Sequence, residues 1–196
     1  MFLDLFGALT SILSTYYFVR LDSKAWSVGL VATSLNSLLY WQNAIYADMT
    51  LEMFYFFSNC YGWYLWRQSH SQKELAIGHL SKKQGYLLFI AVISGFLLIL
   101  GLLKMFTHSN VAVLDALTTA LSLAAQLLMC YKIITTWILW FFTDVLYAYM
   151  YLHKRLAFHG LMMFIYTVMA VVGYISWTRQ RDNRLKSTLT DRVHYS

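Results

Sequence analysis

The chain has 196 residues, of which 59% are apolar and only 12% charged, and this is more apolar surface than a soluble domain of its size can bury. The net charge of +6 does not indicate a nucleic-acid partner, because the basic residues stand in short gaps between apolar runs, where they act as topology signals. Both cysteines lie inside apolar runs, so neither a disulfide nor a metal site is expected. These features predict an all-α integral membrane protein.

Seven apolar runs are long enough to cross the hydrocarbon core of a bilayer, which takes roughly 17–25 helical residues. They occupy, in chain order, residues 3–19, 25–42, 44–66, 85–106, 111–131, 134–152 and 157–178. The fourth run consists almost entirely of Leu, Ile, Val, Phe and Gly, which is typical of a lipid-facing helix. From Arg179 onward the chain is charged and lacks an apolar period, so this part is predicted to be a tail.

The distribution of basic residues predicts the orientation of the chain. If the runs cross alternately, Lys104, Lys154 and Arg155 fall on one side, and the rest of the 15 Lys and Arg residues fall on the other. Since basic residues concentrate on the cytoplasmic side, the N-terminus is expected outside and the C-terminus in the cytoplasm. The chain is therefore predicted to be a multi-pass protein of an inner-type membrane, surrounded by lipid.

A shift of the chain on itself by 111 residues aligns residue types that chance pairs least often. The matched pairs are Asp4–Asp115, Ser11–Ser122, Trp26–Trp137, Leu35–Leu146, Tyr40–Tyr151, Tyr55–Tyr166, Gly62–Gly173 and Trp66–Trp177. The shift maps the first three runs onto the last three, with the fourth as a connector. This predicts two parallel three-helix repeats (1–68 and 111–179), a loop and connecting helix (69–110) and a cytoplasmic tail (180–196), as in transporters with parallel repeats.

Polar and aromatic side chains form stripes along several runs. In the sixth run, Trp137, Asp144 and Tyr151 recur every seven residues and share one helical face. Beside them lie Trp140 and Tyr147. Comparable faces carry Glu52, Tyr55 and Asn59 in the third run and Asp115, Thr119, Ser122 and Gln126 in the fifth. Such faces are expected to point into the bundle rather than toward lipid.

Asp144 is the strongest candidate for a functional residue, because it lies about midway along its run. A carboxylate at the centre of a membrane helix costs roughly 2.5–3.5 kcal/mol on insertion scales. It should therefore face the interior of the bundle or a water-filled cavity.

Several other positions keep two interpretations. Trp26 and Trp177 stand near the ends of their runs, where tryptophan commonly forms a belt at the membrane interface. Asn59 and Gln126 could contact a substrate or join helices by hydrogen bonds. No histidine pairs with a second ligand at a metal-binding spacing, and no nucleotide-binding loop or nucleophile motif is present. The chain is therefore predicted to be no enzyme and to need no metal or cofactor.

One segment resembles a known family. The third run contains Tyr46-Ala47-Asp48, then Phe54-Tyr55, then Tyr61-Gly62-Trp63-Tyr64-Leu65-Trp66, and the second half continues with Trp137-Ile138-Leu139-Trp140, Asp144, His153-Lys154, Tyr166, Gly173 and Trp177. This pattern resembles the third-span signature of the PnuC family of vitamin transporters, and the likeness extends from about Trp26 to Trp177.

Membership implies a SWEET-like arrangement of three, one and three helices, often in a homotrimer. It implies facilitated diffusion of nicotinamide riboside, which a cytoplasmic kinase then traps by phosphorylation. Relatives carry thiamine, riboflavin or deoxynucleosides. The substrate-binding positions that the resemblance and the polar stripes indicate are Glu52, Tyr55, Asn59, Gln126, Trp137, Trp140, Asp144 and Tyr147.

Two acidic residues depart from the pattern of the riboside carriers. Asp144 stands where such carriers tend to have Asn, and Glu52 stands where the third span usually has Gln. Both changes add negative charge, which favours a cation that stacks on aromatic rings, as nicotinamide riboside and thiamine both can. Thiamine is therefore the alternative substrate. A sugar carrier of SWEET type is disfavoured because the chain contains no proline, and a non-transporting receptor or scaffold is the alternative from another class.

Overall fold

The fold is that of a computed structural model, in which residues 2–42, 46–68, 76–106, 112–153 and 157–194 are described. Within these ranges, the side chains of residues 2–4, 46–48, 157–158 and 188–194 lie outside the description. Asp4, which the shift by 111 residues pairs with Asp115, and Asp48 of the family pattern belong to this group.

The described residues form seven α-helices, one for each predicted run. They are α1 (Phe2–Val19), α2 (Lys24–Gln42), α3 (Tyr46–Gln68), α4 (Lys82–Phe106), α5 (Ala112–Cys130), α6 (Thr135–His153) and α7 (Ala157–His194). Six helices end within a few residues of the predicted bounds. The seventh does not, because α7 continues as helix through the segment predicted to be a tail.

Three of the described helices are both long and apolar enough to cross a membrane, and α1 contains a shorter apolar segment, Leu5–Val19. The three are Lys82–Phe106, Ala112–Cys130 and the segment His159–Ser187 of α7. The helices α2, α3 and α6 have 19, 23 and 19 residues, and at about 1.5 Å per residue this is close to the thickness of the hydrocarbon core.

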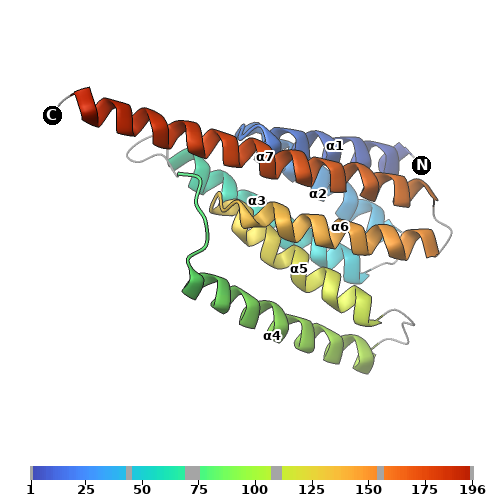
Figure 1. Cartoon of the computed structure of the whole chain (residues 1–196). Helices are drawn as coiled ribbons and strands as arrows, with labels where there is room; N and C mark the ends of the chain where they lie inside the picture. Colours follow the sequence, from blue (N-terminus) through green and yellow to red (C-terminus); the bar gives the residue numbers. More distant parts are fainter. Residues whose placement is uncertain (1, 43–45, 69–75, 107–111, 154–156, 195–196) are drawn as a thin grey trace.

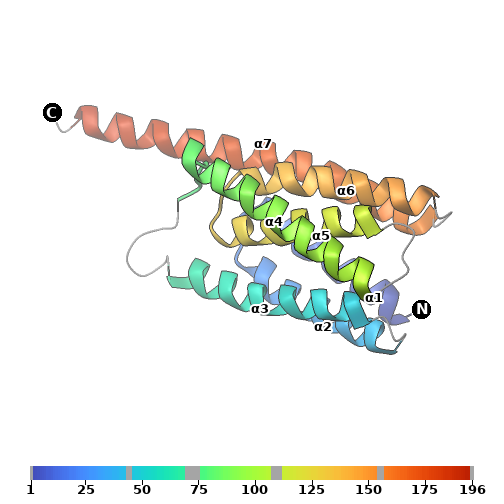
Figure 2. The ribbon, with the colours of Figure 1, turned by 90° about the horizontal axis from the view of Figure 1, so that it is seen from below.

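Six helices form a closed ring. The contacts run from α1 to α2, α2 to α3, α3 to α5, α5 to α6, α6 to α7, and from α7 back to α1. The remaining helix, α4, has α5 as its one helical neighbour among the described residues; it is the lowest helix in Figure 1 and lies in front of α5 in Figure 2, the view from below. None of its residues is buried, as expected for the most apolar run. The ring therefore encloses an interior to which α1–α3 and α5–α7 both contribute, and these two sets of helices are called the first and second halves below.

The turns α1–α2 and α5–α6 are built from the same backbone hydrogen bonds. Asp22 N–H donates to Tyr17 O at 3.0 Å, and Ile133 N–H donates to Leu128 O at 3.1 Å. These bonds span six residues, as in the Schellman motif that ends many helices. In both turns the residue just before the donor, Leu21 or Lys132, adopts a left-handed backbone conformation, with φ of 57° and 53°.

Four tryptophans occupy the interior at the end of the bundle that carries these two turns, which is called the turn end below. They are Trp26, Trp66, Trp137 and Trp177, each 3% exposed or less, and Phe18 packs beside them. Ring centroids lie 5.3 Å apart for Trp26 and Trp66, 6.2 Å for Trp66 and Trp177, and 5.4 Å for Trp137 and Trp177. This tryptophan cluster is the main part of the apolar core.

Two glycines let helices approach two of these rings. A Cβ atom added to Gly62 would overlap the indole of Trp26, and one added to Gly173 would overlap the indole of Trp137. Each ring therefore packs directly on the backbone of a neighbouring helix of its own half. Small residues commonly permit such close packing between membrane helices.

The segment before α4 returns to the bundle. Gly78 N–H donates to Lys132 O at 3.1 Å, and Ile134 N–H donates to Gly78 O at 3.0 Å. The neighbouring Ile77 is buried in the core. Part of the loop between the third and fourth runs is therefore fixed to the α5–α6 turn.

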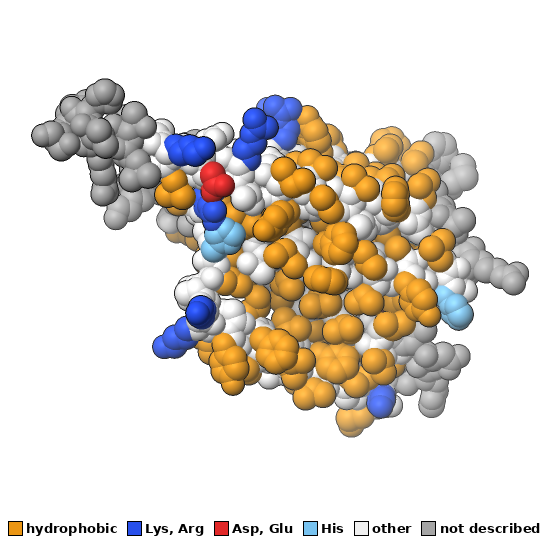
Figure 3. Space-filling model, viewed as in Figure 1, with side chains coloured by type: hydrophobic (Ala, Val, Ile, Leu, Met, Phe, Trp, Pro, Cys, Tyr) orange, Lys and Arg blue, Asp and Glu red, His pale blue; other side chains and the backbone are white. Residues whose placement is uncertain are grey.

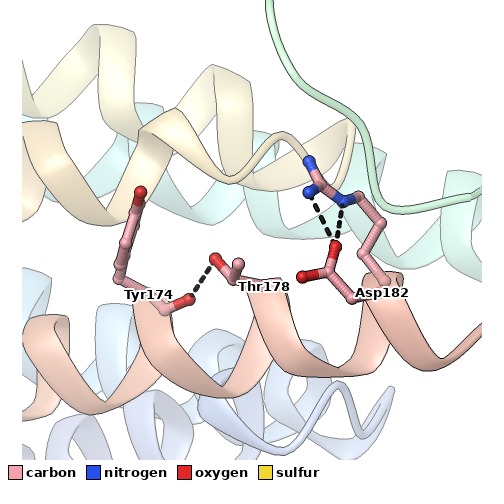
Figure 4. A network of polar contacts seen from close by, with 4 residues as sticks. Tyr174, Thr178 and Asp182 are labelled. Atoms are coloured by element: carbon pink, nitrogen blue, oxygen red, sulfur yellow. Dashed lines mark hydrogen bonds and ion pairs between the residues drawn. The ribbon is translucent and has the colours of Figure 1, made fainter.

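The last turns of α7 project beyond the ring (Figure 1). Figure 4 shows that Thr178 Oγ1 donates to the carbonyl of Tyr174 at 2.8 Å and that Asp182 pairs with the guanidinium of Arg181 at 2.7 Å. These contacts join near neighbours and are local to the helix.

Candidate functional site

Two carboxyl side chains lie among the helices of the ring. Asp144 on α6 is only 7% exposed, and Glu52 on α3 is half-buried. Asn36 on α2 donates a hydrogen bond from Nδ2 to Glu52 Oε1 at 3.2 Å, so this carboxyl is held from a second helix. The prediction that Asp144 faces the interior is confirmed.

Two tyrosines, one from each half, accompany these acids. Tyr55 on α3 interacts with Ser122 on α5, and Tyr166 on α7 interacts with Ser11 on α1. Both tyrosines also interact electrostatically with Glu52 and with Asp144. Each tyrosine–serine interaction therefore joins the two halves near the two acidic residues.

These side chains form a polar centre, which comprises Glu52, Tyr55, Asp144, Tyr147 and Tyr166. Tyr147 belongs to it because it acts electrostatically on Tyr55. Among the described residues, the carboxyl groups that act on Tyr55 and Tyr166 are those of Glu52 and Asp144. A centre with two carboxyls and three phenol rings can accept hydrogen bonds and can bind a cation by charge and by its aromatic faces.

Asn59 and Gln126 meet each other across the two halves. Gln126 Nε2 lies 3.1 Å from Ser58 Oγ and 3.1 Å from Asn59 Oδ1. Asn59 and Gln126 are 4% and 7% exposed. The expectation that they join helices by hydrogen bonds is confirmed, while substrate contact stays a prediction.

Trp137 and Trp140 lie in a different environment. Trp137 is 2% exposed and packs on Gly173 and Trp177 in the tryptophan cluster. It is seven residues before Asp144, or about 10 Å along the helix. Trp140 is half-buried and packs against the same core. The structure thus brings Glu52, Tyr55, Asp144 and Tyr147 together and places the two tryptophans toward the turn end.

The expectation of a membrane-interface belt is wrong for Trp26 and Trp177. Both side chains are 0% exposed. Trp177 donates from Nε1 to the carbonyl of Phe18 at 2.9 Å. Position near the end of a run does not distinguish an interface residue from an interior one, because both lie at the same depth.

Three residues of the site were not among the predicted binding residues. Tyr166 and Ser11 complete the second tyrosine–serine pair, and Asn36 holds Glu52. The shift by 111 residues carried the signal for the first two, because it pairs Tyr166 with Tyr55 and Ser11 with Ser122.

The outer surface agrees with a membrane setting. Figure 3 shows hydrophobic side chains over the middle of this face and Lys and Arg gathered toward the end where α7 projects. Among the described residues, no group of three or more His, Cys, Asp and Glu side chains could hold a metal ion.

An all-helical chain with an apolar surface and carboxyl groups enclosed in its interior is a multi-pass membrane protein with a polar interior. The sequence matches the family described as nicotinamide mononucleotide transporter over residues 1–179, and the chain belongs to this family.

Similar proteins carry related names. The chain is 26% identical over 194 residues to proteins of Escherichia coli (strain K12) and Shigella flexneri named nicotinamide riboside transporter PnuC, with 81% of this chain and 79% of each relative covered. A Haemophilus influenzae protein of the same name is 26% identical over 156 residues, which cover 77% of this chain and 68% of the relative. The crystal structure of the vitamin B3 transporter PnuC is similar with a TM-score of 0.76 and 23% identity, covering 93% of this chain and 83% of that one. The last likeness shows a shared fold.

Proposed function

We propose that this chain transports a cationic vitamin across a bacterial inner membrane, with nicotinamide riboside as the first candidate substrate. The names of its relatives support this substrate, and the family is one of transporters. The proposed mode is facilitated diffusion, with phosphorylation inside the cell trapping the substrate. No catalytic residue, metal or cofactor is assigned.

The observation that carries the proposal is a polar centre inside the ring in which two acidic residues accompany three phenol rings. Glu52 and Asp144 both act on Tyr55 and on Tyr166, which come from different halves. A pyridinium ring supplies the positive charge and the planar face that such a site favours. Asp144 would offset this charge, and Glu52 would accept hydrogen bonds from ribose hydroxyl or amide groups.

The proposed binding residues remain those that the sequence indicates, with Tyr166 added. In this proposal Tyr55, Tyr147 and Tyr166 face the substrate beside the acidic pair. Asn59 and Gln126 contact its polar groups, and Trp137 and Trp140 form the side of the site toward the turn end.

We further propose a SWEET-like arrangement of two parallel three-helix repeats, 1–68 and 111–179, that move relative to each other about this site. Three paired features support it, and in each pair the residues are separated by 111 positions. Leu21 and Lys132 share a left-handed conformation, and the interaction of Tyr55 with Ser122 has its counterpart in that of Tyr166 with Ser11. The third is that Gly62 and Gly173 each contact a tryptophan.

The orientation and the assembly belong to the same proposal. The N-terminus lies outside, the C-terminus lies in the cytoplasm, and the chain forms a homo-oligomer, with a trimer as the expected state. The gathering of Lys and Arg at the end where α7 projects supports this orientation.

A calorimetric titration of the purified protein tests the substrate. The ligands are nicotinamide riboside, thiamine, riboflavin, a deoxynucleoside and a sugar. We expect saturable binding of nicotinamide riboside, together with an increase in thermal stability that follows its concentration. Binding of thiamine alone would favour the alternative substrate, which the same acidic pair also suits. No binding by any of the five would contradict the transporter and favour a scaffold.

A further inference from the structure

Two hydrogen bonds join the two halves through the tryptophan cluster. Trp66 on α3 donates from Nε1 to the carbonyl of Cys130 at the end of α5, at 3.1 Å. Trp177 on α7 donates from Nε1 to the carbonyl of Phe18 near the end of α1, at 2.9 Å. Each bond starts in one half and ends in the other, and all four residues are buried.

The two bonds have related positions in the chain. Trp66 and Trp177 are separated by 111 residues, and the carbonyls that they reach lie in the last turns of the equivalent helices α1 and α5. Carbonyls in a last helical turn lack the usual acceptor role within the helix, so they can accept an indole N–H. The rings of Trp66 and Trp177 also contact each other, with centroids 6.2 Å apart.

These contacts lie to one side of the polar centre. Trp66 follows Tyr55 by eleven residues on α3, which is about 16 Å along the helix. Further contacts at the turn end also link the halves: the hydroxyls of Tyr61 and Tyr131 lie 2.8 Å apart, and the ammonium of Lys132 lies 4.5 Å from the ring of Trp66. The tryptophan cluster therefore fills the interior between the polar centre and the turn end.

We propose that the Trp66–Cys130 and Trp177–Phe18 hydrogen bonds form a paired latch that closes the substrate path at the turn end. This inference rests on the proposed transport function, because a transporter must alternately open and close the substrate path at this end. Opening requires the halves to separate there, which breaks both bonds and exposes the buried Cys130.

The other two indoles of the cluster differ in one respect. Within the described part of the chain, Nε1 of Trp26 and Nε1 of Trp137 are buried without a hydrogen-bond partner. Trp26 packs on a helix of its own half, at Gly62, and donates no bond across the halves. It is thus a matched control that has the same side chain in the same cluster but is no part of the latch.

Cys130 provides a native reporter of opening. The chain has two cysteines, of which Cys60 is exposed and Cys130 is buried. In a Cys60→Ser parent, the rate at which N-ethylmaleimide labels the protein in lipid nanodiscs therefore measures the exposure of Cys130 alone.

We expect slow labelling of the parent and an increase of about two- to tenfold in Trp66→Phe and in Trp177→Phe, since each loses one hydrogen bond of the closed state. The double variant should label faster than either. Trp26→Phe, which loses comparable ring volume, should stay within twofold of the parent, and thermal unfolding of each variant checks that it is folded.

Equal labelling rates in Trp26→Phe and the two latch variants would overturn the latch. Labelling of the parent as fast as that of Cys60 in a Cys130→Ser variant would overturn it as well. Uptake of nicotinamide riboside into proteoliposomes is measured separately, so a parent protein without uptake would count against the transport function and not against the latch.

Discussion

At the scale of single residues, Asp144 has the least ordinary position. It is 7% exposed, and a carboxyl enclosed among membrane helices is retained only where it has a partner or a function. The effect of its charge can be separated from the effect of its shape by substitution with Asn, which has nearly the same volume and no charge. The sequence was sufficient to predict that this residue faces the interior, since a central Asp in an apolar run is costly in contact with lipid.

The Asp144→Asn variant should bind a cationic substrate at least about tenfold more weakly, because truncating one partner of a buried charged pair costs roughly 2–5 kcal/mol. Calorimetry of the purified variant with nicotinamide riboside measures this change. Asp115→Asn is the matched control, because Asp115 lies in the first turn of α5, outside the polar centre. Unchanged affinity in Asp144→Asn would exclude a charge role for this residue.

At the scale of helices, close packing depends on small residues that leave room for a large side chain of the neighbouring helix. Gly62 and Gly173 each lie against an indole. The spacing of seven residues along the sixth run predicted a shared face for Trp137 and Asp144, but it could not tell which neighbour each side chain meets. That is decided by tertiary packing, and for this reason the tryptophans expected at the membrane interface lie in the core.

The Gly62→Ala and Gly173→Ala variants should each be less stable, because the added methyl group overlaps a tryptophan ring and overpacking typically costs about 1–3 kcal/mol. Thermal unfolding in one detergent measures the change. Gly95→Ala on α4 is the control, because an added Cβ there meets its nearest atom, the Cβ of Ala120, at 3.9 Å. This control should be as stable as the parent or more so, since Ala favours helix more than Gly does. Equal losses at all three positions would contradict the packing argument.

The positions of the helices could be predicted from the sequence where the membrane environment determines them. A run of apolar residues between charged ones must be helical in a membrane, because helix satisfies its backbone polar groups internally. Two features of the fold could not be predicted in this way. The left-handed residues of the two turns are Leu21 and Lys132, where glycine is the usual signal. The continuation of α7 past Arg179 is the second, because that segment has no apolar period.

At the scale of the whole molecule, the closed ring places the polar centre and the tryptophan cluster in one interior. The shift by 111 residues matched Trp, Gly and Tyr positions and supports the proposed repeat. It did not predict that the tyrosine–serine interactions cross between halves. A match between two segments of one sequence does not indicate which contacts form between them.

The orientation of the molecule is testable with one added cysteine. In a variant with Cys60→Ser and Cys130→Ser, Lys186→Cys on the projecting part of α7 should react with a membrane-impermeant maleimide in inverted vesicles and not in intact cells. The reason is that basic residues remain on the cytoplasmic side. Leu5→Cys on α1 serves as the opposite marker. Labelling of Lys186→Cys in intact cells would reverse the proposed topology.

Helix α7 runs from Ala157 to His194 as one element. The chain has no proline, and α7 has no glycine after Gly173, so the usual causes of a kink are missing between Trp177 and the projecting end. The helix is therefore expected to move as one stiff rod, with one end in the interior and the other outside the ring. A molecule that binds the projecting end and displaces it would also displace Trp177 in the interior.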